Sequence, residues 1–117
     1  MSLTGIRGNR AEKMALNFFK QRGFKLIEKN YHCRFGEIDI IMQDKDYLVF
    51  IEVRYRRSDK FGGALASVNQ NKQSKLRRSA EYYLIQHKRS DAPCRFDILA
   101  INGELDKPSF HWIDNAF

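Results

Sequence analysis

The chain has 117 residues, of which 43% are hydrophobic and 13% aromatic, so it is expected to form one globular domain over residues 1–117. No apolar run reaches the roughly 18 residues of a membrane span, and two isolated cysteines give no disulfide framework, so we expect no membrane partner and a cytoplasmic location. The formal net charge is +7, and positions 54–89 hold ten basic residues against two acidic ones. This segment favours a polyanionic partner such as nucleic acid.

The N-terminal half of the sequence predicts one helix and three strands. Apolar residues recur at helical spacing from Ala11 to Phe19, with Asn9 as the candidate N-cap and Gly23 as the residue that ends the helix. A polar turn at residues 44–46 separates the second strand from the third. The three strands are expected at residues 24–30, 37–43 and 47–55.

The C-terminal half predicts a loop, a long helix and two further strands. The loop covers residues 56–66, and the helix covers about residues 68–86. The two strands are expected at residues 96–102 and 110–113. The order α-β-β-β-α-β-β predicts an α/β domain in which helices flank a mixed β-sheet.

The second and third predicted strands carry acidic residues in their interior, where apolar residues would be usual. Side chains two apart on a strand share a face, so Glu37 points the same way as Asp39, and Glu52 the same way as Arg54. A turn of two or four residues places Asp39 opposite Glu52. An odd-length turn without a bulge would place these two carboxylates on opposite faces.

A divalent metal ion would explain why two carboxylates face each other, because like charges repel across a sheet. Mg2+ or Mn2+ held by Asp39 and Glu52 would polarise a phosphoryl oxygen and lower the pKa of a bound water. Arg54 would contact the scissile phosphate and stabilise developing charge, since its guanidinium stays protonated and cannot act as a general base. Glu37 either joins this site or lines the entrance of the hairpin.

The same features resemble the PD-(D/E)xK nuclease superfamily, with its αβββαβ restriction-endonuclease-like core. The chain carries an early Glu12 on a helix, then Asp39, then Glu52-Val53-Arg54 on the next strand and a basic helix. It closely resembles the small bacterial YraN-like family over nearly its full length, and it is similar to archaeal-type Holliday-junction resolvases. The matching segments are Ala11-Glu12, GEIDII, VFIEVRYR, Phe61-Gly62, Lys72 and Arg95-Phe96-Asp97.

The resemblance implies metal-dependent endonuclease activity on DNA, including branched or structured DNA, with Glu12 as an additional metal ligand. Glu12 also has a structural alternative, because Asn9-x-x-Glu12 has the form of a capping box. The superfamily lysine is replaced here by Arg54. Lys72, near the start of the second predicted helix, is the other candidate for the missing ammonium group. A non-catalytic nucleic-acid-binding protein with a degenerate nuclease fold is the competing interpretation.

Basic residues around the predicted loop and second helix are expected to contact phosphates as a group, with DNA as the expected partner. The group consists of Arg56, Arg57, Lys72, Lys75, Arg77 and Arg78. Asp97 lies in the middle of the fourth predicted strand and is expected to pair with an arginine, such as Arg95 or Arg54, rather than bind a metal. The sequence is compatible with a homodimer.

Overall fold

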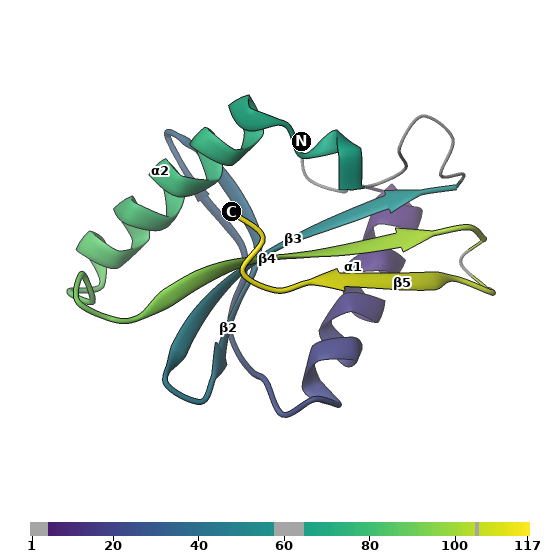
Figure 1. Ribbon diagram of the computed structural model, residues 1–117, viewed down its shortest axis with the longest axis horizontal. Coiled ribbons are helices and arrows are strands. Elements are labelled where there is room, and N and C mark those ends of the chain that lie inside the picture. The colour runs from purple at the N-terminus through teal and green to yellow at the C-terminus, as the bar shows by residue number, and fades with distance from the viewer. Residues whose placement is uncertain (1–4, 58–64, 105) are drawn as a thin grey trace.

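The computed structural model describes residues 5–57, 65–104 and 106–117, and it combines helices with one β-sheet (Figure 1). The mixed α/β architecture predicted from the sequence is confirmed. The elements are α1 (Gly5–Lys20), β1 (Lys25–Cys33), β2 (Gly36–Asp44), β3 (Tyr47–Arg56), the short 3-10 helix η2 (Leu65–Ser67), α2 (Gln70–Gln86), β4 (Cys94–Asn102) and β5 (Ser109–Ile113).

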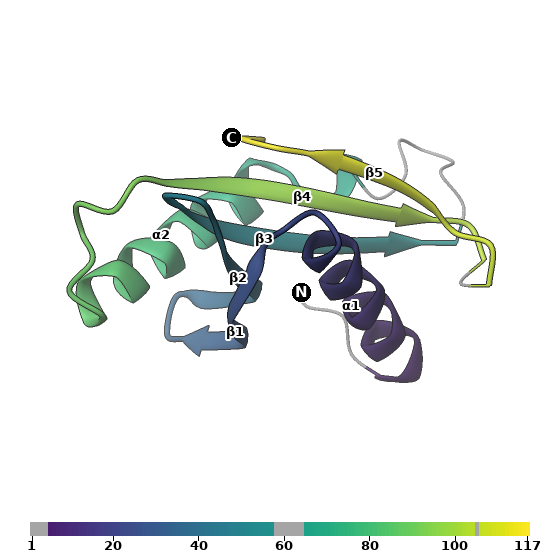
Figure 2. The same cartoon turned by 90° about the horizontal axis from the view of Figure 1, so that it is seen from below.

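The strands of the described part of the chain form one five-stranded sheet in the order β1-β2-β3-β4-β5. The β1–β2, β2–β3 and β4–β5 pairs are antiparallel, whereas β3 and β4 are parallel. Figure 2 shows β3, β4 and β5 running side by side. Parallel neighbours need a crossover connection, and the segment containing α2 provides it between β3 and β4.

The core consists of two apolar clusters that share the alternating residues of β3. On one face, Ala15 and Phe19 of α1 belong to the same cluster as Ile51 and Val53. The other cluster combines residues of β3 and α2, namely Leu48, Phe50, Leu76, Ala80 and Tyr83. Because successive strand residues point to opposite faces, the two helices cover opposite sides of β3. Neither of these helices is long and apolar enough to cross a membrane, nor is any other helix in the described ranges.

The start of α1 and the end of β1 differ most from the predicted boundaries. α1 begins at Gly5, so Asn9 lies inside the helix and its assignment as the N-cap is wrong. β1 continues to Cys33, three residues beyond the predicted end, because Tyr31 is buried against the ring of Tyr83 in α2. The extension of β1 thus depends on a contact that is distant in sequence. The Phe61-Gly62 segment and most of the predicted loop at residues 56–66 lie outside the described residues.

Candidate active site

The turn between β2 and β3 has two residues, which is one of the two turn lengths, two or four, that were considered from the sequence. Asp44 pairs with Tyr47 across the turn, and Lys45 adopts a left-handed φ of 54°. The register runs on from there to the pair Ile40 and Ile51. The observed pairing ends at this step, so the predicted pairing of Asp39 with Glu52 lies one position beyond it and stays a prediction.

Asp39 lies at the point where the pairing of β2 with β3 ends. Its side chain is 1% exposed, and its Oδ2 atom accepts a hydrogen bond of 2.9 Å from the main-chain N–H of Val53. The carboxylate thus accepts the hydrogen bond that a main-chain carbonyl of β2 would accept if the β2–β3 pairing continued. This contact fixes the orientation of Asp39 relative to β3.

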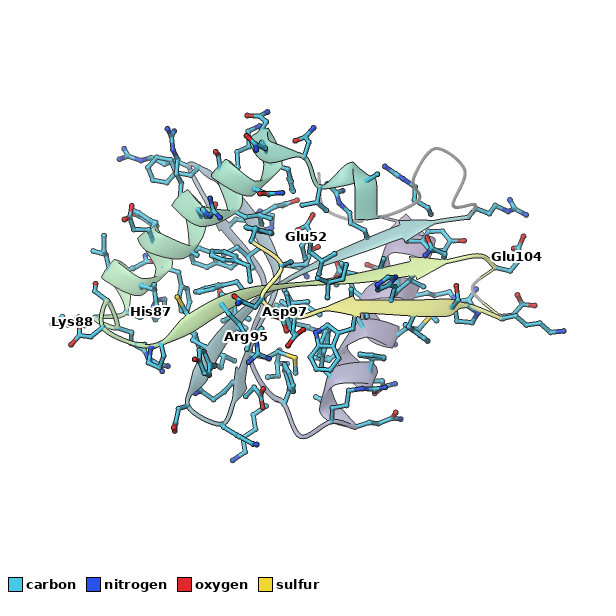
Figure 3. All side chains as sticks on the ribbon, in the orientation of Figure 1. Glu52, His87, Lys88, Arg95, Asp97 and Glu104 are labelled. Atoms are coloured by element: carbon cyan, nitrogen blue, oxygen red, sulfur yellow. The ribbon has the colours of Figure 1, made fainter. Side chains whose placement is uncertain are left out.

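Glu52 is a buried carboxylate that is compensated by two cations. The Nε atom of Arg54 lies 3.2 Å from Glu52 Oε2, and the Nζ atom of Lys72 lies 3.7 Å from the same oxygen. Within the described residues, neither oxygen of Glu52 accepts a hydrogen bond of good geometry, although the residue is 2% exposed. Glu52 lies between β3 and the first turns of α2 (Figure 3). Both sequence candidates for the superfamily cation therefore reach one carboxylate oxygen.

The two carboxylates influence each other's ionisation. Burial raises the pKa of Glu52 to about 8, with the Asp39 carboxylate as the second cause, and the cations Lys72 and Arg54 oppose this increase. Burial also raises the pKa of Asp39, while the Val53 hydrogen bond and Lys72 oppose it. The metal-free pair therefore retains a proton near neutral pH.

Glu12 approaches this pair from α1. Burial and the Asp39 carboxylate raise the pKa of Glu12, and a hydrogen bond with the Asn30 side chain lowers it. Because Glu12 lies in the interior of α1 rather than at its start, the capping-box alternative is wrong. The described residues nevertheless contain no group of three His, Cys, Asp or Glu side chains arranged to hold a metal ion. Glu12 is thus close to Asp39 without completing a three-carboxylate set.

Asn30 is a site neighbour that the sequence analysis missed. It occupies the register step opposite Asp39 on β1, between the pairs Lys29–Ile40 and Tyr31–Ile38, and its φ is 52°. Asparagine tolerates this left-handed conformation better than most residues. Asn30 is the last residue of the strand predicted at residues 24–30, so no local signal marked it as a neighbour of the site.

Glu37 contacts His32 on the neighbouring strand. The Nδ1 atom of His32 lies 3.0 Å from Glu37 Oε2, and both residues line a cleft. Glu37 contributes to the raised pKa values of Asp39 and Glu12, which places its charge near theirs. Of the two roles considered for Glu37, a position at the entrance of the site agrees with this contact.

The cleft has a volume of about 690 Å3 and opens between the β1–β2 turn and the first half of α2. Glu52 lies beneath two of its lining residues. The charged side chains that line it are Arg34, Glu37, Arg54, Lys72 and Lys75. Four cations against one carboxylate make this concave surface suited to an anionic ligand.

The structure divides the basic group predicted to contact phosphates. Lys72 and Lys75 line the cleft, whereas Arg57 forms an exposed ion pair of 3.0 Å with Glu104. Figure 3 shows Glu104 at the end of the sheet, far from Glu52. The remaining members also lie outside the cleft lining: Arg56 is exposed at the end of β3, Arg77 lies over the ring of Phe117, and Arg78 lines a smaller neighbouring cavity.

Asp97 has a structural role. It is fully buried and accepts hydrogen bonds of 3.0 Å from Arg95, from the indole of Trp112 and from the main chain of Asn115. Arg95 also donates to Asp44 at 3.1 Å. The prediction that Asp97 pairs with an arginine is confirmed, and Arg95 is the partner (Figure 3).

Comparison with known proteins identifies one family. A family described as "Uncharacterised protein family UPF0102" matches residues 11–101. A UPF0102 protein of Nitrosomonas europaea is 51% identical over all of this chain and 98% of its own length. A UPF0102 protein of Psychromonas ingrahamii is also 51% identical and is covered over 93% of its length. One from Legionella pneumophila is 45% identical over 98% of this chain and 97% of its own length. These names state a family and no activity.

Proposed function

Since the chain belongs to the UPF0102 family, the YraN-like family that its motifs resemble, we propose that it is a metal-dependent endonuclease that hydrolyses phosphodiester bonds in DNA. One observation carries the proposal. Asp39 and Glu52 are both buried on the neighbouring strands of one hairpin, the Asp39 charge raises the pKa of Glu52, and Glu52 meets two cations that line a basic cleft. Two adjacent carboxylates are rarely buried for structural reasons alone, because each carboxylate loses its hydration on burial.

The residues of this site suit Mg2+ or Mn2+. Both ions prefer carboxylate oxygens and are commonly held by one or two carboxylates together with water and substrate phosphate. Asp39 and Glu52 would hold the ion, and the Glu52 oxygens accept no hydrogen bond of good geometry from the described residues that would compete. When bound, the ion would polarise a phosphoryl oxygen and lower the pKa of a coordinated water. Two protein carboxylates are enough for this type of site, so a complete set with Glu12 is not required.

Arg54 and Lys72 would stabilise the charge of the reacting phosphate. Their nitrogens lie 3.2 and 3.7 Å from Glu52 Oε2, so a phosphate oxygen that enters beside Glu52 would meet both donors. Hydrogen bonds from ionised donors to phosphate are short and strong. Arg54 also donates to the main-chain carbonyl of Ser67 at 3.4 Å, which restrains its guanidinium group. Charge stabilisation by such positioned donors is commonly the largest contribution to catalysis.

A nucleic-acid-binding protein without cleavage activity is the second candidate. Two observations favour it. Arg54 stands where the superfamily carries a lysine, and the described residues contain no three-ligand metal group. This candidate keeps the basic cleft as a binding surface and leaves the buried carboxylates without a chemical role.

Cleavage of a DNA panel separates the two candidates. Linear, flapped and four-way-junction DNAs are incubated with the protein in Mg2+, in Mn2+ and in EDTA. The matched control is the double variant Asp39→Asn/Glu52→Gln, which keeps the size of both side chains and removes their charge. We expect cleavage only by the wild type with metal, and calorimetric binding of Mg2+ or Mn2+ only by the wild type. DNA binding without cleavage of any substrate would favour the second candidate.

A further inference from the structure

A second cavity adjoins the cleft on the far side of the β1–β2 turn. Its volume is about 320 Å3, and the turn residues Arg34 and Phe35 line both cavities. We call it the aromatic pocket. Its lining consists of Arg34, Phe35, Arg78, Glu81, Tyr82 and Ile85. The two cavities are therefore separated only by the tip of one hairpin turn.

The aromatic pocket combines rings with arginines. The ring centroids of Phe35 and Tyr82 lie 6.0 Å apart, and the guanidinium carbon of Arg34 lies 4.9 Å from the Phe35 centroid. Tyr82 and Ile85 are 38% and 62% exposed. Exposed apolar side chains that gather beside cations are typical of a binding surface rather than of a random surface position.

The turn is held against α2 by close packing. Gly36 has a φ of 147°, and a Cβ atom on it would lie 3.4 Å from Ser79 Oγ and 3.8 Å from Lys75 Cβ. The turn therefore lies within van der Waals distance of the helix, and its positive φ, rather than a lack of space, favours glycine at this position. Phe35 is consequently positioned by the fold, and not by the presence of a ligand.

We propose that the aromatic pocket binds an unpaired nucleobase of the DNA strand whose phosphate lies in the cleft. The substrate of the site is then DNA with single-stranded or unpaired nucleotides beside the scissile bond. The inference rests on the proposed function for the assignment of the cleft to a phosphate. Aromatic rings bind the faces of bases without sequence preference, and those faces are covered by neighbouring bases in an intact duplex.

The charges of the aromatic pocket favour nucleic acid over another apolar partner. Arg34 and Arg78 outnumber Glu81, so the pocket attracts an anionic strand. Arg34 lines both cavities and can contact the phosphate that joins a base in the pocket to a phosphate in the cleft. A second copy of this chain carries the same positive charge and would be repelled there.

Binding measurements in EDTA test the proposal without requiring cleavage. The probes are a fluorescently labelled single-stranded 12-mer, the blunt duplex of the same sequence, and a single strand with one 2-aminopurine, whose fluorescence falls when it stacks. The test variant is Phe35→Leu, which keeps an apolar side chain and removes the ring. Phe110→Leu is the matched control, because Phe110 is 40% exposed and contacts Phe18 on another part of the surface.

We expect Phe35→Leu to weaken single-strand binding on the order of tenfold and to abolish the 2-aminopurine quenching, with duplex binding and the Phe110→Leu variant unchanged. Tyr82→Leu should reproduce the loss if Phe35→Leu fails to fold. Equal losses for single strand and duplex, or no loss in quenching, would overturn the proposal. The proposal would also be overturned if Phe35→Leu altered only the sedimentation coefficient and left DNA binding unchanged, because the pocket would then be a contact between copies of the chain. The nuclease proposal is judged separately, by cleavage in Mg2+ or Mn2+.

Discussion

At the scale of single residues, Asp39 and Glu52 lie on the two strands of one hairpin but are held by different groups. Asp39 accepts a main-chain hydrogen bond from Val53, whereas Glu52 is compensated by side-chain cations. A main-chain donor cannot be removed by a rotamer change, but long cationic side chains can turn toward a ligand. Asp39 is therefore suited to hold an ion in place, and the partners of Glu52 are suited to move to a phosphate.

Replacement of the cations tests which of them acts on the phosphate. Arg54 lies closer to Glu52 than Lys72 does and is fixed on the strand. We expect Arg54→Met to reduce the cleavage rate on the order of 10²–10³-fold. Arg54→Lys should retain or raise the rate, and Lys72→Met should cost less than Arg54→Met. Single-turnover cleavage rates with Mn2+ provide the measurement. Normal cleavage by Arg54→Met together with an inactive Lys72→Met would transfer the role to α2.

The raised pKa of Glu52 predicts a pH dependence of stability. Its pKa is about 8 in the folded protein, against an ordinary value of 4.5, so the folded state keeps a proton that the unfolded state releases. The contribution of Glu52 to the free energy of unfolding is therefore largest below about pH 4.5 and falls as the pH rises toward 8.

Glu52→Gln carries no ionisable group at this position and should lose that part of the pH dependence. In metal-free buffer, we expect the free energy of unfolding of this variant to gain about 3 kcal/mol relative to that of the wild type as the pH rises from 5 to 8. Urea unfolding at several pH values measures the difference. Glu104→Gln is the control, because Glu104 is an exposed carboxylate paired with Arg57. Parallel pH profiles for the wild type and Glu52→Gln would show that Glu52 ionises normally.

At the scale of the elements, α2 begins with a capping contact that orients the candidate site. Asn69 is the N-cap residue, and its side-chain oxygen accepts a 2.9 Å hydrogen bond from the main-chain N–H of Lys72. The residue that is capped is the one whose ammonium group reaches Glu52. The start of the helix and the position of the cation are therefore coupled.

Loss of this cap should reduce stability. Asn69→Ala removes the capping oxygen and is expected to cost about 1 kcal/mol in the free energy of unfolding, whereas Asn69→Asp should retain most of it. Asn71→Ala serves as the control, because Asn71 also lines the cleft but follows the cap. Urea unfolding gives all three values. A loss for Asn71→Ala as large as that for Asn69→Ala would mean that the cap is not the cause.

The hairpin register was predictable from the sequence, but the neighbours of the site were not. Alternation along a strand and a short even turn were sufficient to predict the observed pairing from Asp44–Tyr47 to Ile40–Ile51. Three features depend on contacts that are distant in sequence and have no local pattern. These are the extension of β1 through Tyr31, the hydrogen bond of Asn30 with Glu12, and the ion pair of Arg57 with Glu104. The start of α1 was misplaced for a different reason, since Asn9 has the residue type of a cap but lies inside the helix.

At the scale of the whole molecule, the excess positive charge is not spread evenly over the basic segment. Lys72 and Lys75 face the cleft, Arg78 lines the aromatic pocket, and Arg57 pairs with an acidic residue at the other end of the sheet. Position in the fold, rather than position in the basic segment, therefore decides which cations line the cleft. From the sequence, these residues were predicted to act as one group, because a sequence does not show which basic side chains already have acidic partners.

The salt dependence of DNA binding separates these cations one at a time. Each cation that neutralises a phosphate releases counterions and adds about 0.9 to the slope of log affinity against log salt for duplex DNA, or about 0.7 for a single strand. Lys75→Ala should reduce that slope by about this amount, because Lys75 lines the cleft. Arg57→Ala should leave the slope unchanged, because Arg57 is engaged by Glu104 3.0 Å away. Fluorescence anisotropy across a salt series, in EDTA, provides both slopes. A smaller slope for Arg57→Ala with an unchanged slope for Lys75→Ala would place the DNA at the end of the sheet, away from the carboxylates. The cleft would then not be part of the binding surface.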